Sequence, residues 1–221
     1  LYLRQPNTLK YLLLFGDGSY AYKSQIGRNT NFVPIYESRN TLHPLLTYSS
    51  DDYFGFMEAT EGEWAESGSS SVLNSHTLDL GVGRLPAQTQ SEAKIMVDKL
   101  IRYASEPATL GKWRQKVALA ADDGDINTHQ RDADALGKII ENQYRGFNPE
   151  KIFVDAYPQV TEGTVKRSEI AREKVVKSYE EGALILNFTG HGNELGWTSE
   201  NILDMFLIEN LANQNTMPLL V

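Results

Sequence analysis

Residues 183–193 read Ala-Leu-Ile-Leu-Asn-Phe-Thr-Gly-His-Gly-Asn, an apolar run that ends in a histidine between two glycines. A short apolar run closed by a turn signal is typical of a strand buried in a sheet. Such a strand would deliver His191 to the carboxyl edge of a parallel sheet, where sites form in α/β proteins. Gly190 and Gly192 permit unusual backbone dihedral angles and leave space beside the imidazole. This stretch therefore predicts a buried strand and a candidate catalytic position at its end.

Strands and helices alternate on both sides of this stretch. Apolar runs at 116–121 and 151–156 are each followed by a helical pattern, and a last strand is expected at 217–221. Strict alternation predicts a mostly parallel sheet flanked by helices, an α/β fold. We expect His191 to be flanked by the end of the strand that begins near Met217. Between them, a helix is expected to contain Ile202, Leu203, Phe206 and Leu211.

The first half of the chain is less regular. Residues 11–15 form an apolar run closed by Gly16-Asp17-Gly18, which predicts a buried strand and a tight turn. A further strand is predicted at 78–85, and an imperfect extended segment at 47–57. The stretch 62–75 is rich in Gly, Ser and Glu and is expected to be a mobile surface loop.

A helix and a domain boundary follow. Ser91 is expected to cap a helix whose apolar face is made of residues at helical spacing, namely Ala93, Val97, Leu100, Ile101 and Ala104. The stretch 106–115 contains Pro107 and Gly111 between two periodic regions. We therefore predict two subdomains, residues 1–110 and residues 111–221.

Composition limits the possible functions. The 221 residues carry a formal net charge of −8, which argues against binding to nucleic acid or to anionic membranes. No apolar run is long enough to span a bilayer. Without cysteine the chain has no disulfide and no thiolate metal site. The sequence begins at Leu1 without an initiator Met and ends on the apolar run 217–221. We therefore expect the chain to be an excised part of a longer protein.

His191 and Gly192 suit acyl-transfer chemistry. A neutral imidazole exchanges a proton with a thiol near neutral pH, which makes cysteine its natural partner. The Gly192 amide is placed to donate a hydrogen bond to an oxyanion. The alternative is a hydrogen-bonded loop histidine whose glycines serve only the turn. The residues alone leave both interpretations open.

An ordered set of motifs carries a family resemblance. Thr189-Gly190-His191-Gly192 after an apolar strand, then Trp197 and a short helix, then residues 217–221, resembles the gingipain-type cysteine peptidases of family C25, which have a caspase-like fold. Upstream motifs look closer to one branch, the signal peptidase of the type IX secretion system. These motifs are Leu14–Ser19, Asp51–Gly55, Gly81–Pro86 and Ala121–Asp123.

The resemblance implies a cysteine endopeptidase that cleaves exported proteins, removing C-terminal type IX secretion signals. It implies His191 as general base and acid, Gly192 as an oxyanion donor, and a nucleophilic cysteine about four residues beyond Val221. It further implies a protein or peptide substrate, outer-membrane secretion components as partners, and a location in the bacterial periplasm or at the outer-membrane surface. The chain itself is expected to be inactive because it lacks cysteine.

Three carboxylates are candidates for supporting roles. The resemblance implies that Asp51 or Asp52 receives a substrate side chain, and a carboxylate facing a guanidinium would give bidentate selectivity. The simpler interpretation, which we favour, is that Asp51 and Asp52 end a strand or a turn. Asp17 would orient His191 if their strand ends are neighbours, although Gly-Asp-Gly is an ordinary turn former.

Acidic residues also gather at the end of the predicted strand 116–121. Asp122, Asp123 and Asp125 offer oxygen ligands for Ca²⁺ but lack the ligand order of an EF-hand. A solvated cluster favoured by the dipole of the following helix is the simpler interpretation. We expect no other cofactor and no metal site with Cys or His spacing, and we expect His129 to be a surface residue.

Two further functions compete with the peptidase. The chain would be a non-catalytic pseudo-peptidase or a docking module of a secretion complex if the strand begun at Met217 ended without cysteine. Nucleotide binding is disfavoured because neither G-x-G-x-x-G nor G-x-x-x-x-G-K-[ST] occurs.

Overall fold

The computed structural model describes residues 9–19, 31–37, 48–58 and 77–221, apart from 164 and 194. The chain packs as two compact units, Leu1–Ile101 and Arg102–Val221. The division falls within helix α1 (Gln90–Ser105), upstream of the stretch 106–115. The loop expected at residues 62–75 lies outside the described residues.

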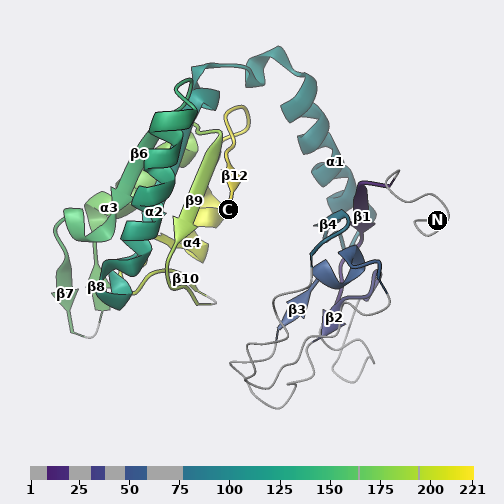
Figure 1. Cartoon of the computed structure of the whole chain (residues 1–221), viewed down its shortest axis with the longest axis horizontal. Helices are drawn as coiled ribbons and strands as arrows, with labels where there is room; N and C mark the ends of the chain where they lie inside the picture. Colours follow the sequence, from purple (N-terminus) through teal and green to yellow (C-terminus); the bar gives the residue numbers. More distant parts are fainter. Residues whose placement is uncertain (1–8, 20–30, 38–47, 59–76, 164, 194) are drawn as a thin grey trace. The chain divides into compact units, whose positions relative to one another are not determined.

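The described residues of the first unit form two small sheets (Figure 1). Strands β1 (Tyr11–Phe15) and β4 (Gly81–Leu85) pair in parallel, and β2 (Tyr36–Glu37) pairs antiparallel with β3 (Ser49–Ser50). The predicted strand at 11–15 is present, but its expected burial is wrong, because only Leu14 is buried while Tyr11, Leu13 and Phe15 are exposed. The strand expected at 78–85 is shorter than predicted. In the described part of the extended segment expected at 47–57, β3 is the only strand, because Asp52–Gly55 turns in a 3₁₀ helix.

Arg84 of β4 ties the loops of the first unit together. Its guanidinium donates hydrogen bonds to the carbonyls of Gly16, Val33 and Pro34 at 2.8, 3.0 and 2.9 Å. It also donates to both carboxylate oxygens of Asp51, at 2.7 and 2.8 Å. Hydrogen bonding to Asp51 raises the pKa of Arg84 against the opposing effect of burial. One cation thus joins three segments that are distant in sequence.

The start of α1 differs from the expected cap. The hydroxyl of Thr89 accepts the backbone N–H of Glu92 at 3.1 Å, while Ser91 lies inside the first turn. The Glu92 carboxylate in turn accepts the Gln88 N–H at 2.8 Å. A cap must stand two or three residues before the free amide that it satisfies, so Thr89 performs the role predicted for Ser91.

The second unit is built on a four-stranded parallel sheet in the order β12-β9-β5-β6. The strands are β5 (Lys116–Ala121), β6 (Asn148–Phe153), β9 (Ile185–Thr189) and β12 (Leu219–Leu220). Strand β5 lies between two neighbours, and residues 117–121 are all buried. The predicted α/β fold with a parallel sheet is confirmed.

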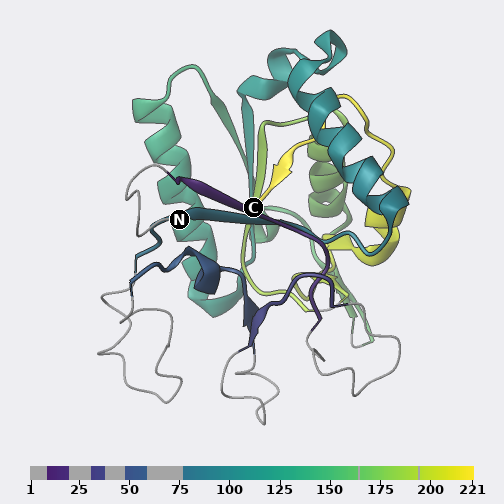
Figure 2. The ribbon, with the colours of Figure 1, turned by 90° about the vertical axis from the view of Figure 1, so that its right-hand side faces the viewer.

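Helices cover both faces of this sheet. Figure 2 shows α2 (Gly124–Gln143) on one side, and α3 (Glu169–Glu180) with α4 (Met205–Asn210) on the other. Gly137 of α2 lies so close to Leu119 that an added Cβ would stand 3.3 Å from that side chain. On the opposite face, a buried cluster includes Ala118, Ala120, Ile152, Ala171, Val175, Leu186, Ile202 and Leu203.

Short hairpins were missed by the pattern of apolar residues. Strands β7 (Val160–Glu162) and β8 (Val165–Arg167) form one, and β10 (Gly196–Trp197) pairs antiparallel with β11 (Leu203–Asp204). The helix expected to contain Ile202 and Leu203 begins only at Met205, because the Asp204 side chain accepts the Leu207 N–H at 2.8 Å and caps it.

Replacement of Leu119 by Ala tests the core of the second unit. Leu119 is 2% exposed, so Leu119→Ala should lower the free energy of unfolding by about 2–5 kcal/mol. The matched control Leu110→Ala changes a side chain that is 63% exposed and should cost less than about 0.5 kcal/mol. Urea denaturation followed by circular dichroism measures both; equal losses would contradict the packing described.

Candidate active site

The pairing of β5 with β9 brings Asp122 and His191 to one edge of the sheet. Ala121 is the register partner of Thr189, so both strands end at the same level. The Asp122 N–H donates to the Thr189 carbonyl at 3.1 Å and extends the pairing by one step. Asp122 and His191 therefore emerge side by side at the carboxyl ends of neighbouring strands, where sites are expected in such sheets.

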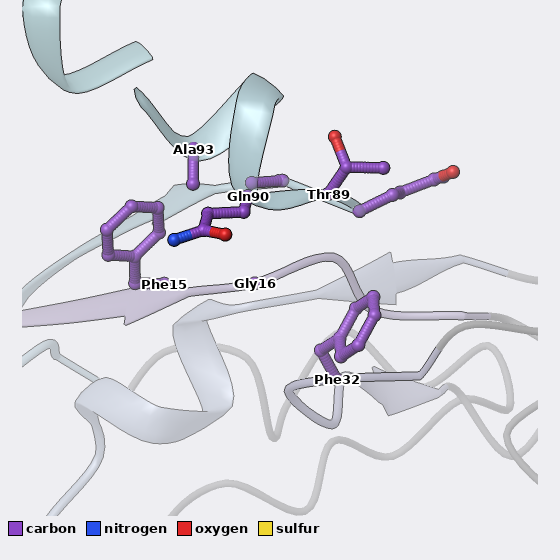
Figure 3. Close-up of a pocket in the computed structure, with 8 residues that line it drawn as sticks. Phe15, Gly16, Phe32, Thr89, Gln90 and Ala93 are labelled. Atoms are coloured by element: carbon purple, nitrogen blue, oxygen red, sulfur yellow. The ribbon is translucent and has the colours of Figure 1, made fainter. Parts of the chain in front are cut away.

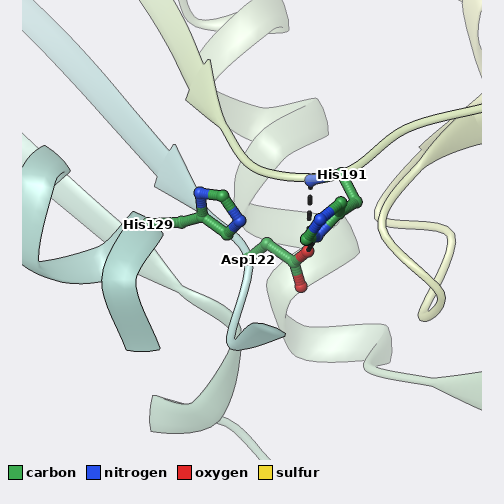
Figure 4. Close-up of side chains that lie close together, drawn as sticks. All are labelled: Asp122, His129 and His191. Atoms are coloured by element: carbon green, nitrogen blue, oxygen red, sulfur yellow. Dashed lines mark hydrogen bonds and ion pairs between the residues drawn. The ribbon is translucent and has the colours of Figure 1, made fainter. Parts of the chain in front are cut away.

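The Asp122 carboxylate holds His191 at two points (Figure 4). Its Oδ2 accepts the backbone N–H of His191 at 3.2 Å and lies 3.0 Å from Nδ1 of the ring. Its Oδ1 accepts the Gly124 N–H at 3.2 Å. The Asp122 side chain is 6% exposed and that of His191 is 61% exposed. A buried carboxylate thus positions an imidazole that remains open to solvent.

The charge state of Asp122 results from opposing effects. Burial, the largest single influence, raises the pKa of Asp122, but the hydrogen bonds from His191 and Gly124 together outweigh it and leave the pKa below its usual range. Asp122 is therefore ionised near neutral pH. An ionised carboxylate only accepts hydrogen bonds, so it favours the tautomer of His191 that carries a proton on Nδ1.

Gly190 permits this close approach. An added Cβ at Gly190 would collide with the Cβ of Asp122 and come within 2.9 Å of the Phe188 ring. Any larger residue would push the histidine loop away from the end of β5. The glycine before His191 is thus required by packing between two strand ends.

Gly192 lies in a more open position. An added Cβ would meet only the Gly196 carbonyl, at 3.4 Å. Gly192 forms an isolated antiparallel bridge with Trp197, whose hydrogen bonds are donated by Asn193 and Thr198. The bridge fixes the backbone at Gly192, but its hydrogen bonds do not involve the Gly192 N–H. An oxyanion donor needs an N–H that is free in this way.

Two more side chains from the start of α2 contact His191. Oδ2 of Asp125 lies 3.4 Å from Nε2 of His191 and 3.6 Å from Nε2 of His129. The rings of His129 and His191 meet edge to face with centroids 4.8 Å apart. The His129 side chain is only 21% exposed, so the expectation of a surface histidine is wrong. Asp122 likewise is a buried partner of His191 and not part of a solvated cluster.

The backbone at the start of α2 is unusual. Asp125, Ile126 and Asn127 have φ values of 52°, 56° and 58°, in the left-handed region. This conformation is costly for a β-branched residue such as Ile126. Strained backbone tends to occur at functional sites, and here it carries Asp125 next to the His191 ring.

Glu200 is a buried carboxylate that the sequence patterns did not reveal. Its side chain is fully buried, and among the described residues Oε2 has no hydrogen-bond partner. Oε1 accepts the Ser199 hydroxyl at 2.8 Å and lies 3.9 Å from Nζ of Lys166. Carboxylate oxygens of Asp122, Asp123 and Glu200 lie within 4.8 Å of one another. No motif marks Glu200, which lies between β10 and β11.

The other predicted site residues belong to the first unit. Asp51 is paired with Arg84, so a substrate guanidinium would have to displace an internal one. The Asp52 N–H donates to the Ser50 hydroxyl at 3.1 Å. Asp17 accepts from Nε2 of Gln88 at 2.7 Å. The substrate roles of Asp51 and Asp52 and the orienting role of Asp17 remain predictions.

The first unit also has an open apolar pocket where β1 ends and α1 begins (Figure 3). Phe15, Phe32 and Ala93 are among the residues that line it. A second small pocket is lined by Asp17, Asp51 and Arg84 with neighbouring residues. Neither pocket was evident from the sequence.

A buried carboxylate that orients an exposed histidine at the carboxyl edge of a parallel sheet defines an α/β protein with a site suited to proton transfer. The match to a family model specifies this class further. The chain belongs to peptidase family C25, whose model matches residues 1–221. Among the described residues, no helix has the length and apolar character that crossing a membrane requires.

Solved structures agree with this fold. The chain is similar over 99% of its length to gingipain R, an Arg-specific cysteine proteinase, with 17% sequence identity and a TM-score of 0.66. A complex of the pro- and mature domains of RgpB from Porphyromonas gingivalis matches 99% of the chain with 18% identity and a TM-score of 0.61. The chain covers 41% and 42% of those two chains. No curated protein matches it.

The lowered pKa of Asp122 predicts how stability depends on pH. Ionised Asp122 stabilises the fold above its ordinary pKa of 3.8, and this contribution is lost as the pH falls through the lower folded-state value. Wild type should therefore exceed Asp122→Asn in stability at pH 6, and the difference should shrink below about pH 4.

Urea denaturation at a series of pH values measures this difference. Asp132→Asn, on the exposed surface of α2, is the matched control for loss of a carboxylate. A difference for Asp122→Asn that stays constant from pH 6 to pH 2.5 would contradict the proposed hydrogen bonding.

Proposed function

We propose that this chain is the histidine-bearing part of a cysteine endopeptidase, in which His191 is the general base and acid. The observation that carries the proposal is the pairing of the exposed His191 ring with the buried carboxylate of Asp122 at the carboxyl edge of the sheet. Membership of peptidase family C25 supports the reaction class.

The position of β12 supports a nucleophile from the next strand. Leu219 pairs with Ile185 and Leu220 with Leu186, so β12 is the parallel neighbour of β9. The Phe188 N–H donates to the Val221 carbonyl at 2.8 Å and continues this register. A strand that ran on in the same register would bring the fourth residue after Val221 opposite His191. Neighbouring strands lie about 4.8 Å apart, so a thiol there would be within reach of the imidazole.

The proposed reaction uses Asp122, His191 and Gly192 of this chain together with the cysteine of the longer protein. Nδ1–H of His191 donates to Asp122, and the other ring nitrogen, Nε2, accepts the proton of the cysteine thiol. The thiolate attacks the substrate carbonyl, and the Gly192 amide donates to the resulting oxyanion. The protonated ring then gives its proton to the leaving amine, and an acyl-enzyme forms. Water then attacks this thioester, and His191 accepts the proton of the water. His191 returns the proton to the cysteine sulfur, and the carboxylic acid product is released.

The sequence motifs support a proposal for the substrate and the setting. We propose a protein substrate, namely exported proteins whose C-terminal type IX secretion signal is removed, in the bacterial periplasm or at the outer-membrane surface. Outer-membrane secretion components would be the partners. The support is the ordered set of motifs between Leu14 and Asp123, which resembles the signal peptidase of that system.

Thiol chemistry tests the mechanism. The longer protein should contain a cysteine about four residues beyond Val221, and a thiol-directed inhibitor should label it and abolish peptidase activity. This chain has no cysteine, so it should be neither labelled nor active. In the longer protein, His191→Ala should lower kcat by about 10²- to 10⁴-fold, and Asp122→Asn should lower it without removing the labelled thiol.

Asp132→Asn, on the exposed surface of α2, is the matched control and should leave kcat unchanged. Peptidase activity in a clean preparation of this chain alone would overturn the proposal. Another residue at the predicted cysteine position, together with an inactive longer protein, would favour a pseudo-peptidase or a docking module.

Substrate selection by Asp51 or Asp52 is tested separately. If either carboxylate receives the side chain before the cleaved bond, Asp51→Asn or Asp52→Asn should reduce kcat/KM for peptides with Arg or Lys at that position, because the charge-assisted hydrogen bond is lost. Peptides with Ala there are the control substrates. If the ratio of kcat/KM for the Arg or Lys peptides to kcat/KM for the Ala peptides is unchanged in both variants, neither carboxylate sets specificity.

A further inference from the structure

Two imidazoles and a carboxylate converge at the carboxyl edge of the second unit. One donor atom each of Asp122, His129 and His191 lies within 4.8 Å of the other two. Figure 4 shows that the three side chains come from three segments: the end of β5, the helix α2 and the loop after β9. The geometry points to a binding site for a divalent transition-metal ion, with Zn²⁺ as the best fit, formed by Asp122, His129 and His191.

His129 provides an independent indication. Its Nε2 is buried, and among the described residues it makes no hydrogen bond; the nearest carboxylate oxygen, on Asp125, is 3.6 Å away. Buried ring nitrogens are normally satisfied by a partner. Proton transfer by His191 does not use this nitrogen. A metal ion between the rings of His129 and His191 would be bound by Nε2 of His129.

The ligand types select the class of metal. Imidazole and carboxylate ligands suit Zn²⁺, whereas Ca²⁺ and Mg²⁺ prefer oxygen ligands alone. Zinc–ligand distances of about 2.0–2.2 Å place tetrahedral ligands roughly 3.4 Å apart. The donor atoms of Asp122, His129 and His191 lie within 4.8 Å of one another, so side-chain movements of roughly 1 Å would bring them to this spacing.

Metal binding would compete with catalysis. The ion would occupy a ring nitrogen of His191 and an oxygen of Asp122, the groups that the proposed mechanism uses to move a proton. Zn²⁺ would therefore act as a reversible inhibitor of the longer enzyme. This consequence rests on the proposed function, but binding to the chain does not.

Titration of this chain tests binding directly. The chain has no cysteine, so isothermal titration with Zn²⁺ and the visible absorption of bound Co²⁺ report nitrogen and oxygen ligands alone. We expect one ion per chain, and His129→Gln should weaken binding at least about tenfold. Asp132→Asn, on the exposed surface of α2, is the matched control for Asp122→Asn and should leave the affinity unchanged. Circular dichroism verifies that each variant is folded, and Asp122→Asn provides a second weakened variant.

Several results would overturn the inference. These are an absence of Zn²⁺ binding at millimolar concentration, an affinity unchanged by His129→Gln, or Ca²⁺ competing equally with Zn²⁺. The last result would indicate an oxygen-only site at Asp122, Asp123 and Glu200.

The longer protein separates this inference from the proposed function. An inactive enzyme in the presence of a chelator would refute the peptidase proposal but not the metal site. An active enzyme, together with failure of the cysteine-free chain to bind Zn²⁺, would refute the metal site but not the peptidase.

Discussion

The second unit depends on one buried carboxylate. Asp122 follows the fully buried part of β5 and accepts hydrogen bonds from the backbone and ring of His191 and from the amide at the start of α2. Burial alone would favour the neutral acid, and these donors reverse that preference. The same interaction therefore fixes the histidine loop, orients the imidazole and supplies the negative charge next to it.

Small residues make this arrangement sterically possible. Ala118, Ala120 and Ala121 leave no exposed surface at the centre of the sheet, and Gly190 allows the loop after β9 to approach Asp122. The parallel register then sets which side chains meet, because β5 and β9 end at the same level and β12 lies on the far side of β9. The parallel order of β5, β9 and β12 thus places Asp122 and His191 where the proposed peptidase chemistry needs them.

Sequence patterns located regular elements well and local interactions poorly. Strands at 11–15 and 116–121 coincide with β1 and β5, since apolar runs favour strands, but only β5 is buried along its length. The cap at Thr89 and the helix start at Met205 were misplaced, because several Ser, Thr and Asp residues compete and only the fold decides which one faces a free amide. The hairpins β7–β8 and β10–β11 are too short for their alternation to be distinctive.

From the sequence alone, the parallel α/β fold and the candidate histidine could be determined, because both depend on apolar periodicity and on glycines next to one residue. The partners of that histidine were decided by tertiary structure. Asp122, Asp125 and His129 are about sixty to seventy positions from His191 in the chain, and their sequence context is that of a solvated helix start. Only the pairing of β5 with β9 makes them neighbours, because strand register converts a distance along the chain into a contact of about 3 Å.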